Sequence, residues 1–235
     1  MRLLIVSTSK IHGSEYLEYL REEVIDFFGQ NKTIVFIPYA RPGGITWDEY
    51  TQLAKEKFHA FGLEMKGIHE FESPIKALEE ADGVFTGGGN TFVLLQTLYH
   101  YQLVKPLREL VQGGLPYMGS SAGSNITGPS IKTTNDMPII YPPSFNALQL
   151  VPFQINPHYL DPDPNSKHMG ETRETRIKEF LVFNSTPVLG LREGSWLRID
   201  EKKCHLKGAL TARFFENGKD PREIKPGDQS WLLDV

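Results

Sequence analysis

Short apolar runs alternate with segments of helical periodicity over the first half of the chain, and this alternation limits the fold most. Apolar runs that we expect to be strands cover residues 3–7, 33–38, 63–68, 83–86 and 115–118. Between them, the sequence predicts helices over residues 16–28, 46–61, 74–81, 90–98 and 105–112. Such an order predicts an α/β fold, with a mostly parallel sheet and helices on both faces.

The second half of the sequence has a different pattern. Residues 129–164 are rich in Pro and Asn and show little periodicity, which in a compact chain is often a sign of a functional segment. A helix is expected over residues 171–183. Short strands with β-hairpin signals follow at residues 188–191, 196–199, 204–207 and 210–215. Because no stretch has the composition of a linker, we expect residues 1–235 to form one domain.

Composition excludes several classes of protein. The formal net charge is −4, so a polyanionic partner such as DNA is not expected. No apolar run approaches the roughly 18 residues of a membrane span. Cys204 is the only cysteine, and we expect it to be an ordinary strand residue and not a zinc ligand. The sequence therefore predicts a cytoplasmic protein that needs neither a metal nor a cofactor and has no nucleic acid or membrane partner.

The pattern G-x-S-x-G occurs once, as Gly119-Ser120-Ser121-Ala122-Gly123. It follows an expected strand and precedes a helix start, which is the context of a nucleophile elbow. In that interpretation Ser121 is the nucleophile, and the N–H of Ala122 faces an oxyanion. The alternative is a turn of small residues that allows close packing.

A second glycine-rich strand end, Gly87-Gly88-Gly89, precedes a helix that Asn90 can cap. It matches neither the dinucleotide-binding nor the P-loop spacing, so a phosphate cradle is the weaker interpretation. Next to a nucleophile elbow, the N–H of Gly89 fits the second donor of an oxyanion hole.

A nucleophilic serine needs a base and an acid that orients the base. His158 follows a short apolar strand and is the best base by position, while His12, in a loop after the first strand, stays open. Asp136 and Glu193 are the candidate acids, and spacing alone does not decide between them. With Glu193 as the acid, the order Ser, His, Glu also differs from that of the α/β-hydrolases, so that scaffold is not expected.

Five segments together resemble the peptidase E family, the α-aspartyl dipeptidases of serine peptidase family S51. The segments are GGGNT at 87–91, GSSAGSN at 119–125, TTNDMPI at 133–139, QINPH at 154–158 and GETRETRI at 170–177. The resemblance covers nearly the whole chain. It implies a fold like that of class I glutamine amidotransferases, here with C-terminal β-hairpins, and hydrolysis of dipeptides that begin with aspartate.

The resemblance also implies roles for single residues. Ser121 is the nucleophile and His158 the base. Glu193 and Asp136 have both been treated as the acid in this family; we favour Glu193, which follows a strand, and assign Asp136 to shaping the pocket. The family often has Pro before the acid, where this chain has Arg192.

An aspartate side chain in the substrate needs a cation, and Arg173 is the best candidate. The competing interpretation is a solvated helix residue paired with Glu171 or Glu174. For the substrate's α-amino group, Glu171 or Asn90 is the expected partner.

Two alternative functions stay open at this stage. One is a cyanophycinase-like or other hydrolase on the same scaffold, and the other is a binding protein that keeps the elbow for structure. The sequence allows either a monomer or a homodimer.

Overall fold

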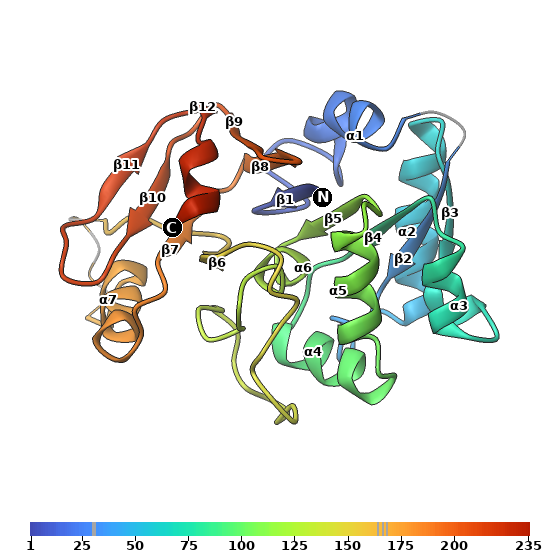
Figure 1. Cartoon of the computed structure of the whole chain (residues 1–235), viewed down its shortest axis with the longest axis horizontal. Coiled ribbons are helices and arrows are strands. Elements are labelled where there is room, and N and C mark those ends of the chain that lie inside the picture. The colour runs from blue at the N-terminus through green and yellow to red at the C-terminus, as the bar shows by residue number, and fades with distance from the viewer. Residues whose placement is uncertain (30–31, 164, 166, 168) are drawn as a thin grey trace.

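The computed structural model describes residues 1–29, 32–163, 165, 167 and 169–235. Its centre is a group of five parallel strands, in the order β1, β5, β4, β2, β3 (Figure 1). Their bounds are Arg2–Val6 for β1, Tyr117–Ser120 for β5, Gly83–Thr86 for β4, Thr33–Ile37 for β2 and Glu64–Gly67 for β3. The five expected strands are confirmed, with bounds that differ by at most two residues.

Antiparallel strands extend this sheet beyond β1. Strand β8 (Ser195–Asp200) pairs with β1 and forms a hairpin with β9 (Lys203–Gly208), which pairs in turn with β12 (Gly227–Asp228). The complete sheet has eight strands. The alternation of buried and half-buried residues along β8 explains why this hairpin could be predicted from the sequence.

A second sheet of four strands lies beside the first, next to helix α7 (Arg173–Phe183) (Figure 1). Strands β6 and β7 pair in parallel, whereas β7 with β10 and β10 with β11 are antiparallel. The bounds are Gln154–Asn156 for β6, Val188–Gly190 for β7, Ala212–Phe215 for β10 and Arg222–Ile224 for β11. The C-terminal hairpins and the helix after residue 171 are thereby confirmed.

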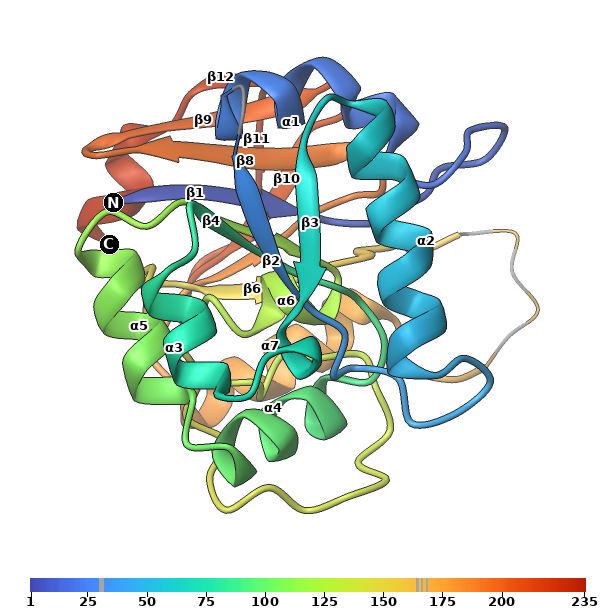
Figure 2. The same ribbon diagram turned by 90° about the vertical axis from the view of Figure 1, so that its right-hand side faces the viewer.

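Helices cover both faces of the larger sheet, as Figure 2 shows for its β2–β3 end. Alternate residues of β1 pack into two different hydrophobic clusters, Leu3 and Ile5 into one, Leu4 and Val6 into the other. The first cluster includes residues of α3 (Pro74–Glu79), α4 (Thr91–His100), α5 (Val104–Gln112) and α6 (Ala122–Asn125). The second includes residues of α1 (Arg21–Phe28) and α2 (Trp47–Ala60).

Local sequence explains some helix starts better than others. Thr46 and Glu49 form the expected capping box of α2, because each side chain accepts a hydrogen bond from the backbone of the other. The helix expected over residues 16–28 is only partly present, since a 3₁₀ turn precedes α1. The 3₁₀ segments are η1 (Glu18–Leu20), η2 (Ile68–Glu70) and η3 (Ser230–Asp234).

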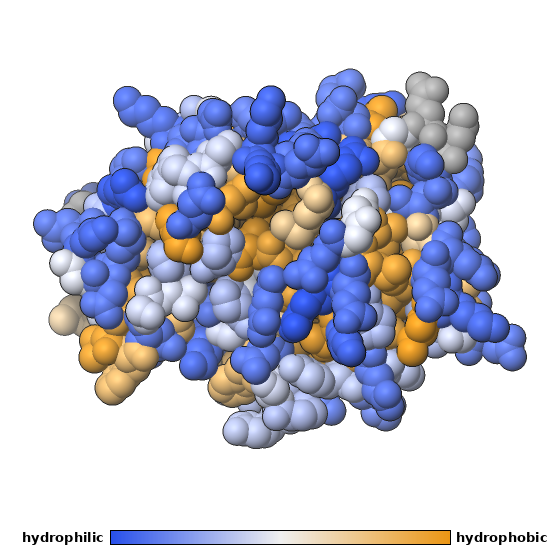
Figure 3. Space-filling view, viewed as in Figure 1, coloured by the Kyte–Doolittle hydropathy of each residue, from blue (hydrophilic) through white to orange (hydrophobic). Residues whose placement is uncertain are grey.

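The surface seen in Figure 3 is mostly hydrophilic, with hydrophobic residues gathered near its centre. Within the described part of the chain, no helix is long and apolar enough to cross a membrane.

The end of β5 is crowded by neighbouring backbone. A Cβ on Gly119 would collide with the carbonyl oxygen of Gly123, and a Cβ on Gly123 would collide with that of Thr86. The two glycines of the G-x-S-x-G pattern are therefore required because β5, α6 and β4 approach each other more closely than any side chain allows.

We expect Gly123→Ala to lower the free energy of unfolding by about 1–3 kcal/mol, because a backbone carbonyl cannot move away as a side chain can. Urea denaturation measures this change. Gly43→Ala is the matched control, since a Cβ there meets no atom within 4 Å. Equal stability of the two variants would contradict the close approach.

Candidate active site

Ser121 lies between β5 and α6 in a backbone conformation that few residues adopt. Its φ is 55° and its ψ is −111°. Hydrogen bonds hold it there: its N–H donates to the carbonyl of Val6 at 3.1 Å, and its own carbonyl accepts from Ser124 and Asn125 at 2.9 Å. A positive φ at a non-glycine residue costs free energy, and such residues are concentrated at functional sites. The turn has the form of a nucleophile elbow, as the motif predicts.

The glycine loop after β4 lies directly against Ser121. A Cβ at Gly88 would be 2.9 Å from the Cβ of Ser121, so only glycine fits. The Gly88 N–H donates to the hydroxyl of Tyr50 on α2 at 3.0 Å. By contrast, the N–H groups of Gly89 and Ala122 donate no hydrogen bond within the described residues. These are the two donors that the sequence assigns to an oxyanion hole.

His158 brings the hydroxyl and a carboxylate into one hydrogen-bonded series. Its Nε2 is 2.9 Å from the Ser121 Oγ, and its Nδ1 is 2.7 Å from the Glu193 Oε1. Ser121 comes from the larger sheet, whereas His158 follows β6 and Glu193 follows β7 of the smaller sheet. The structure therefore brings Glu193, the favoured acid, to the imidazole.

A buried serine that sequence analysis missed positions His158. The Ser7 Oγ accepts the N–H of His158 at 3.0 Å and donates to the carbonyl of Leu191 at 2.8 Å. Ser7 follows β1 and is fully buried. His158 itself has a φ of 54°, so its backbone needs such support. The only signal in the sequence was the position of Ser7 at the carboxyl end of a strand.

Asp136, the other candidate acid, has different hydrogen-bond partners. One oxygen of its carboxylate accepts hydrogen bonds from the N–H of Thr91 at 2.7 Å, the hydroxyl of Thr91 at 2.6 Å and the hydroxyl of Thr134 at 3.0 Å. Because Thr91 is the first residue of α4, the charge also faces the positive end of that helix. Asp136 thus joins the 133–138 segment to the element that follows the Gly87–Gly89 loop, without a hydrogen bond to His158.

Asn90 and Glu171, the expected partners of a substrate amino group, are already engaged. The Asn90 Oδ1 caps α4 by accepting two backbone N–H groups, and its Nδ2 donates to the carbonyl of Met137 at 2.9 Å. Glu171 forms an ion pair with Arg176 at 2.9 Å. Asn90 therefore shapes the loop, and the charge of Glu171 is already paired with that of Arg176.

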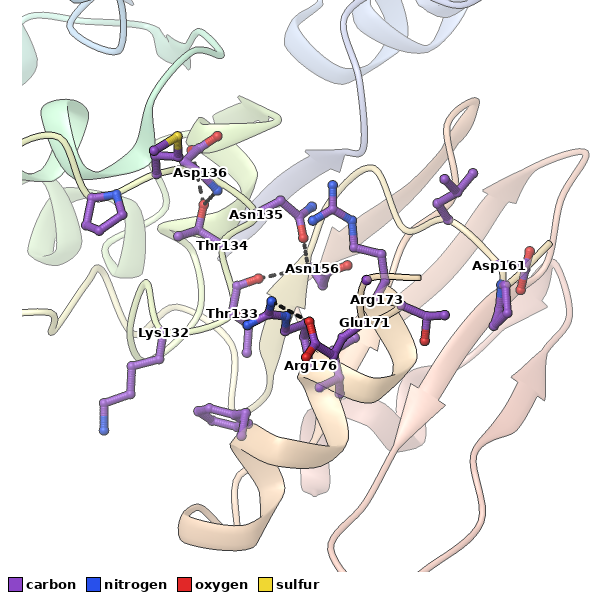
Figure 4. A pocket seen from close by; sticks show the side chains of 18 of the residues that line it. Lys132, Thr133, Thr134, Asn135, Asp136, Asn156, Asp161, Glu171, Arg173 and Arg176 are labelled. Atoms are coloured by element: carbon purple, nitrogen blue, oxygen red, sulfur yellow. Dashed lines mark hydrogen bonds and ion pairs between the residues drawn. The ribbon is translucent and has the colours of Figure 1, made fainter. Parts of the chain in front are cut away.

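A cavity of about 820 Å³ lies between the 132–138 segment, Asn156, the 160–163 segment and the start of α7 (Figure 4). Arg173 lines it and extends from α7 towards Asn135 and Asn156. Among the described residues, Arg173 forms no ion pair with a carboxylate. The two glutamates that the sequence offers as its partners have other cations: Glu171 pairs with Arg176, and Glu174 pairs with Lys178 and Arg213. The cavity thus contains an available guanidinium.

Arg192 clamps the segment that follows His158. Its guanidinium donates two hydrogen bonds to Asp161, at 2.7 and 2.6 Å, and two to Glu223, at 2.9 and 3.0 Å. Hydrogen bonds from Arg192 lower the pKa of Glu223 to about 2 and also hold the pKa of Asp161 below its usual value. The residue that replaces the proline common in the family therefore has a defined partner, and it fixes Asp161 at the cavity wall.

The described residues contain neither a cluster of metal ligands nor an exposed cysteine. No group of three or more potential metal ligands is present there. Cys204 is buried in β9, as expected of an ordinary strand residue, and burial raises the pKa of its thiol to about 12. A hydroxyl, an imidazole and a carboxylate in hydrogen-bonded series beside free backbone N–H groups is instead the arrangement of serine hydrolases.

Comparison with known proteins identifies the family. A sequence model of Peptidase family S51 matches residues 3–207. Peptidase E of Streptomyces coelicolor is 52% identical, over 100% of this chain and 96% of that protein. A probable alpha-aspartyl dipeptidase of Drosophila melanogaster is 48% identical, over 98% and 97% of the two chains. The chain belongs to peptidase family S51 and is a peptidase.

Solved structures agree with this assignment. A candidate peptidase E protein from Listeria monocytogenes EGD-e has a TM-score of 0.67 at 25% identity, over 88% of this chain and 98% of that one. A peptidase from an acI-B1 actinobacterium has a TM-score of 0.70 at 17% identity, over 95% of this chain and 93% of that one. At this identity it supports the fold alone. The class I glutamine amidotransferase-like fold implied by the resemblance is confirmed.

The Arg192 clamp predicts a pH-dependent stability. The pKa of Glu223 is about 2 in the folded chain, against an ordinary value of 4.5, so its carboxylate stabilises the fold above about pH 4.5. That contribution is lost as the pH falls from 4.5 towards 2. Glu223→Gln should therefore lower the free energy of unfolding at pH 7 but much less at pH 3, as measured by urea denaturation.

Glu22→Gln provides the control, because Glu22 is exposed on α1 and its replacement removes the same charge. Its effect on the free energy of unfolding should be small at both pH values. If Glu223→Gln destabilises the chain equally at pH 3 and pH 7, the ionised clamp is wrong.

Proposed function

We propose that this peptidase hydrolyses dipeptides with an N-terminal aspartate through an acyl-enzyme on Ser121. The observation that carries the proposal is the series Ser121 Oγ, His158 Nε2, His158 Nδ1, Glu193 Oε1, with its two hydrogen bonds of 2.9 and 2.7 Å. The names of the relatives, peptidase E and alpha-aspartyl dipeptidase, support the substrate class.

In the first half of the reaction, His158 takes the proton of the Ser121 hydroxyl while Oγ attacks the scissile carbonyl. The N–H groups of Gly89 and Ala122 stabilise the oxyanion, a contribution of about 2.7–4 kcal/mol per donor in comparable enzymes. His158 then gives the proton to the leaving amine as the C–N bond breaks. In the second half, His158 activates a water that hydrolyses the ester and frees Ser121.

Glu193 is assigned as the acid that orients His158 and stabilises the imidazolium. Asp136 is assigned a positioning role. Its hydrogen bonds to Thr91 and Thr134 favour this assignment, because they link the cavity wall to the start of α4. Since the Gly87–Gly89 loop immediately precedes that helix, loss of the Asp136 carboxylate would disturb an oxyanion donor and not the base.

Arg173 is assigned to the side-chain carboxylate of the N-terminal aspartate. A guanidinium can bind a carboxylate with two parallel hydrogen bonds, and the nearby acidic residues of α7 are paired with other cations. This favours a free binding group over the solvated helix residue that the sequence also allowed.

The proposal also includes the number of domains and the cellular location of the chain. We treat residues 1–235 as one domain, because a single hydrophobic cluster contains Leu3 of the larger sheet and Leu189 of the smaller one. A cytoplasmic location is favoured by the presence of only one cysteine. Both monomer and homodimer are compatible with the site.

The test of the substrate class is a comparison of Asp-Leu with Asn-Leu as substrates. Arg173→Met should lower kcat/KM for Asp-Leu by roughly 10- to 100-fold, the contribution of a charge-assisted bidentate pair, with little change for Asn-Leu. Arg176→Met is the matched control. Arg176 lies on the same helix and is already paired with Glu171, so its replacement should lower kcat/KM for Asp-Leu less than that of Arg173.

Ser121→Ala should abolish hydrolysis of both substrates. Cleavage of Asp-Leu by Arg173→Met at the wild-type rate would contradict the assignment of Arg173. Activity of the wild type on β-linked aspartyl-arginine, with none on Asp-Leu, would instead favour the cyanophycinase-like alternative.

A further inference from the structure

The amide of Asn156 has a fixed orientation at the wall of the cavity. Asn156 ends β6 and is only 3% exposed. Its Nδ2 donates to the carbonyl of Thr133 and to the Oδ1 of Asn135, both at 2.8 Å. The Nδ2 of Asn135 donates in turn to the carbonyl of Pro157 at 2.7 Å. Since the two backbone carbonyls can only accept, neither amide can turn round.

This orientation leaves the Oδ1 of Asn156 without a use in the described residues. The oxygen is buried and accepts no hydrogen bond from any of them. An unsatisfied buried acceptor costs free energy, so such groups are rare unless a ligand or water completes them. Asn156 also lines the cavity, where Figure 4 places it between Asn135 and Arg173.

We infer that the Asn156 Oδ1 accepts a hydrogen bond from the α-ammonium group of the substrate. The inference rests on the proposed function and names a partner for a group that it left unassigned. An ammonium has three donors and no acceptor, which matches a lone carbonyl oxygen. Arg173, on the same cavity, takes the carboxylate of the same residue, so the two charged groups of an N-terminal aspartate are recognised separately.

The position of Asn156 in the chain favours this role. It lies two residues before His158, in the segment whose Pro157 carbonyl holds Asn135 and therefore the 133–138 wall of the cavity. A substrate that binds there is placed relative to the imidazole by a short piece of backbone. The site thus selects peptides with a free N-terminus and disfavours those in which the amino group is acetylated or absent.

The experiment compares two chromogenic substrates that differ only in this group. Aspartyl α-p-nitroanilide has the ammonium, and N-(4-nitrophenyl)succinamic acid has the same carboxylate and scissile amide without it. For the wild type, kcat/KM should be at least about tenfold higher for the aspartyl substrate. In Asn156→Leu this ratio should fall to about one, chiefly through loss of activity on the aspartyl substrate.

Asn156→Asp separates binding from structure. A carboxylate keeps an oxygen on the cavity side but loses both donations of Nδ2. We expect the variant to be less stable than the wild type yet to keep or raise the ratio of the two kcat/KM values. A purely structural Asn156 would lower activity on both substrates equally in both variants, and that result would overturn the inference.

Asn125→Leu is the matched control. Asn125 is also a fully buried asparagine whose Oδ1 has no partner in the described residues, and its Nδ2 donates to the carbonyl of Ile155 at 2.6 Å. It does not line the cavity. Its replacement should change both activities by the same factor.

The outcomes also separate the two proposals. If the wild type cleaves neither p-nitroanilide, and Asp-Leu is likewise uncleaved, the proposed function fails. If it cleaves both through Ser121 and Asn156→Leu keeps the wild-type ratio, only the assignment of Asn156 fails.

Discussion

The site depends on one constraint: its reacting groups come from two different sheets and must be held within hydrogen-bonding distance of each other. Ser121 follows β5 of the larger sheet, whereas His158 and Glu193 follow strands of the smaller one. The Ser7 hydroxyl meets this constraint, because it ties the end of β1 both to the N–H of His158 and to the carbonyl of Leu191. The parallel pairing of β6 with β7 then sets the base beside its acid.

Charged residues complete the site in two separate roles. Some are fixed by partners, as Asp136 is by Thr91 and as Arg192 is by Asp161 and Glu223, and these hold the walls of the cavity. Arg173 has no carboxylate partner among the described residues and can serve a ligand. This division explains why residues of the same type in the same segment, such as Arg173 and Arg176, are expected to respond so differently to replacement.

The sequence predicted the elements and the reacting residues better than their surroundings. Gly119 and Gly123 could be assigned because the G-x-S-x-G pattern is local, although the backbone that crowds Gly123 is that of Thr86 on another strand. The choice between Asp136 and Glu193 could not be made from spacing, since it depends on which strand ends meet in space. Ser7 and the amide series of Asn135 and Asn156 were missed for the same reason: their partners lie 21 or more residues away in sequence.

The most direct test of the account is covalent labelling of the folded protein with a small fluorophosphonate, followed by mass spectrometry of the modified peptide. The account predicts one adduct, on Ser121, formed by displacement of fluoride. Its rate of formation should fall sharply in His158→Ala and Glu193→Gln, and less in Asp136→Asn. An adduct on Ser120, no adduct at all, or a larger loss of rate in Asp136→Asn than in Glu193→Gln would contradict it.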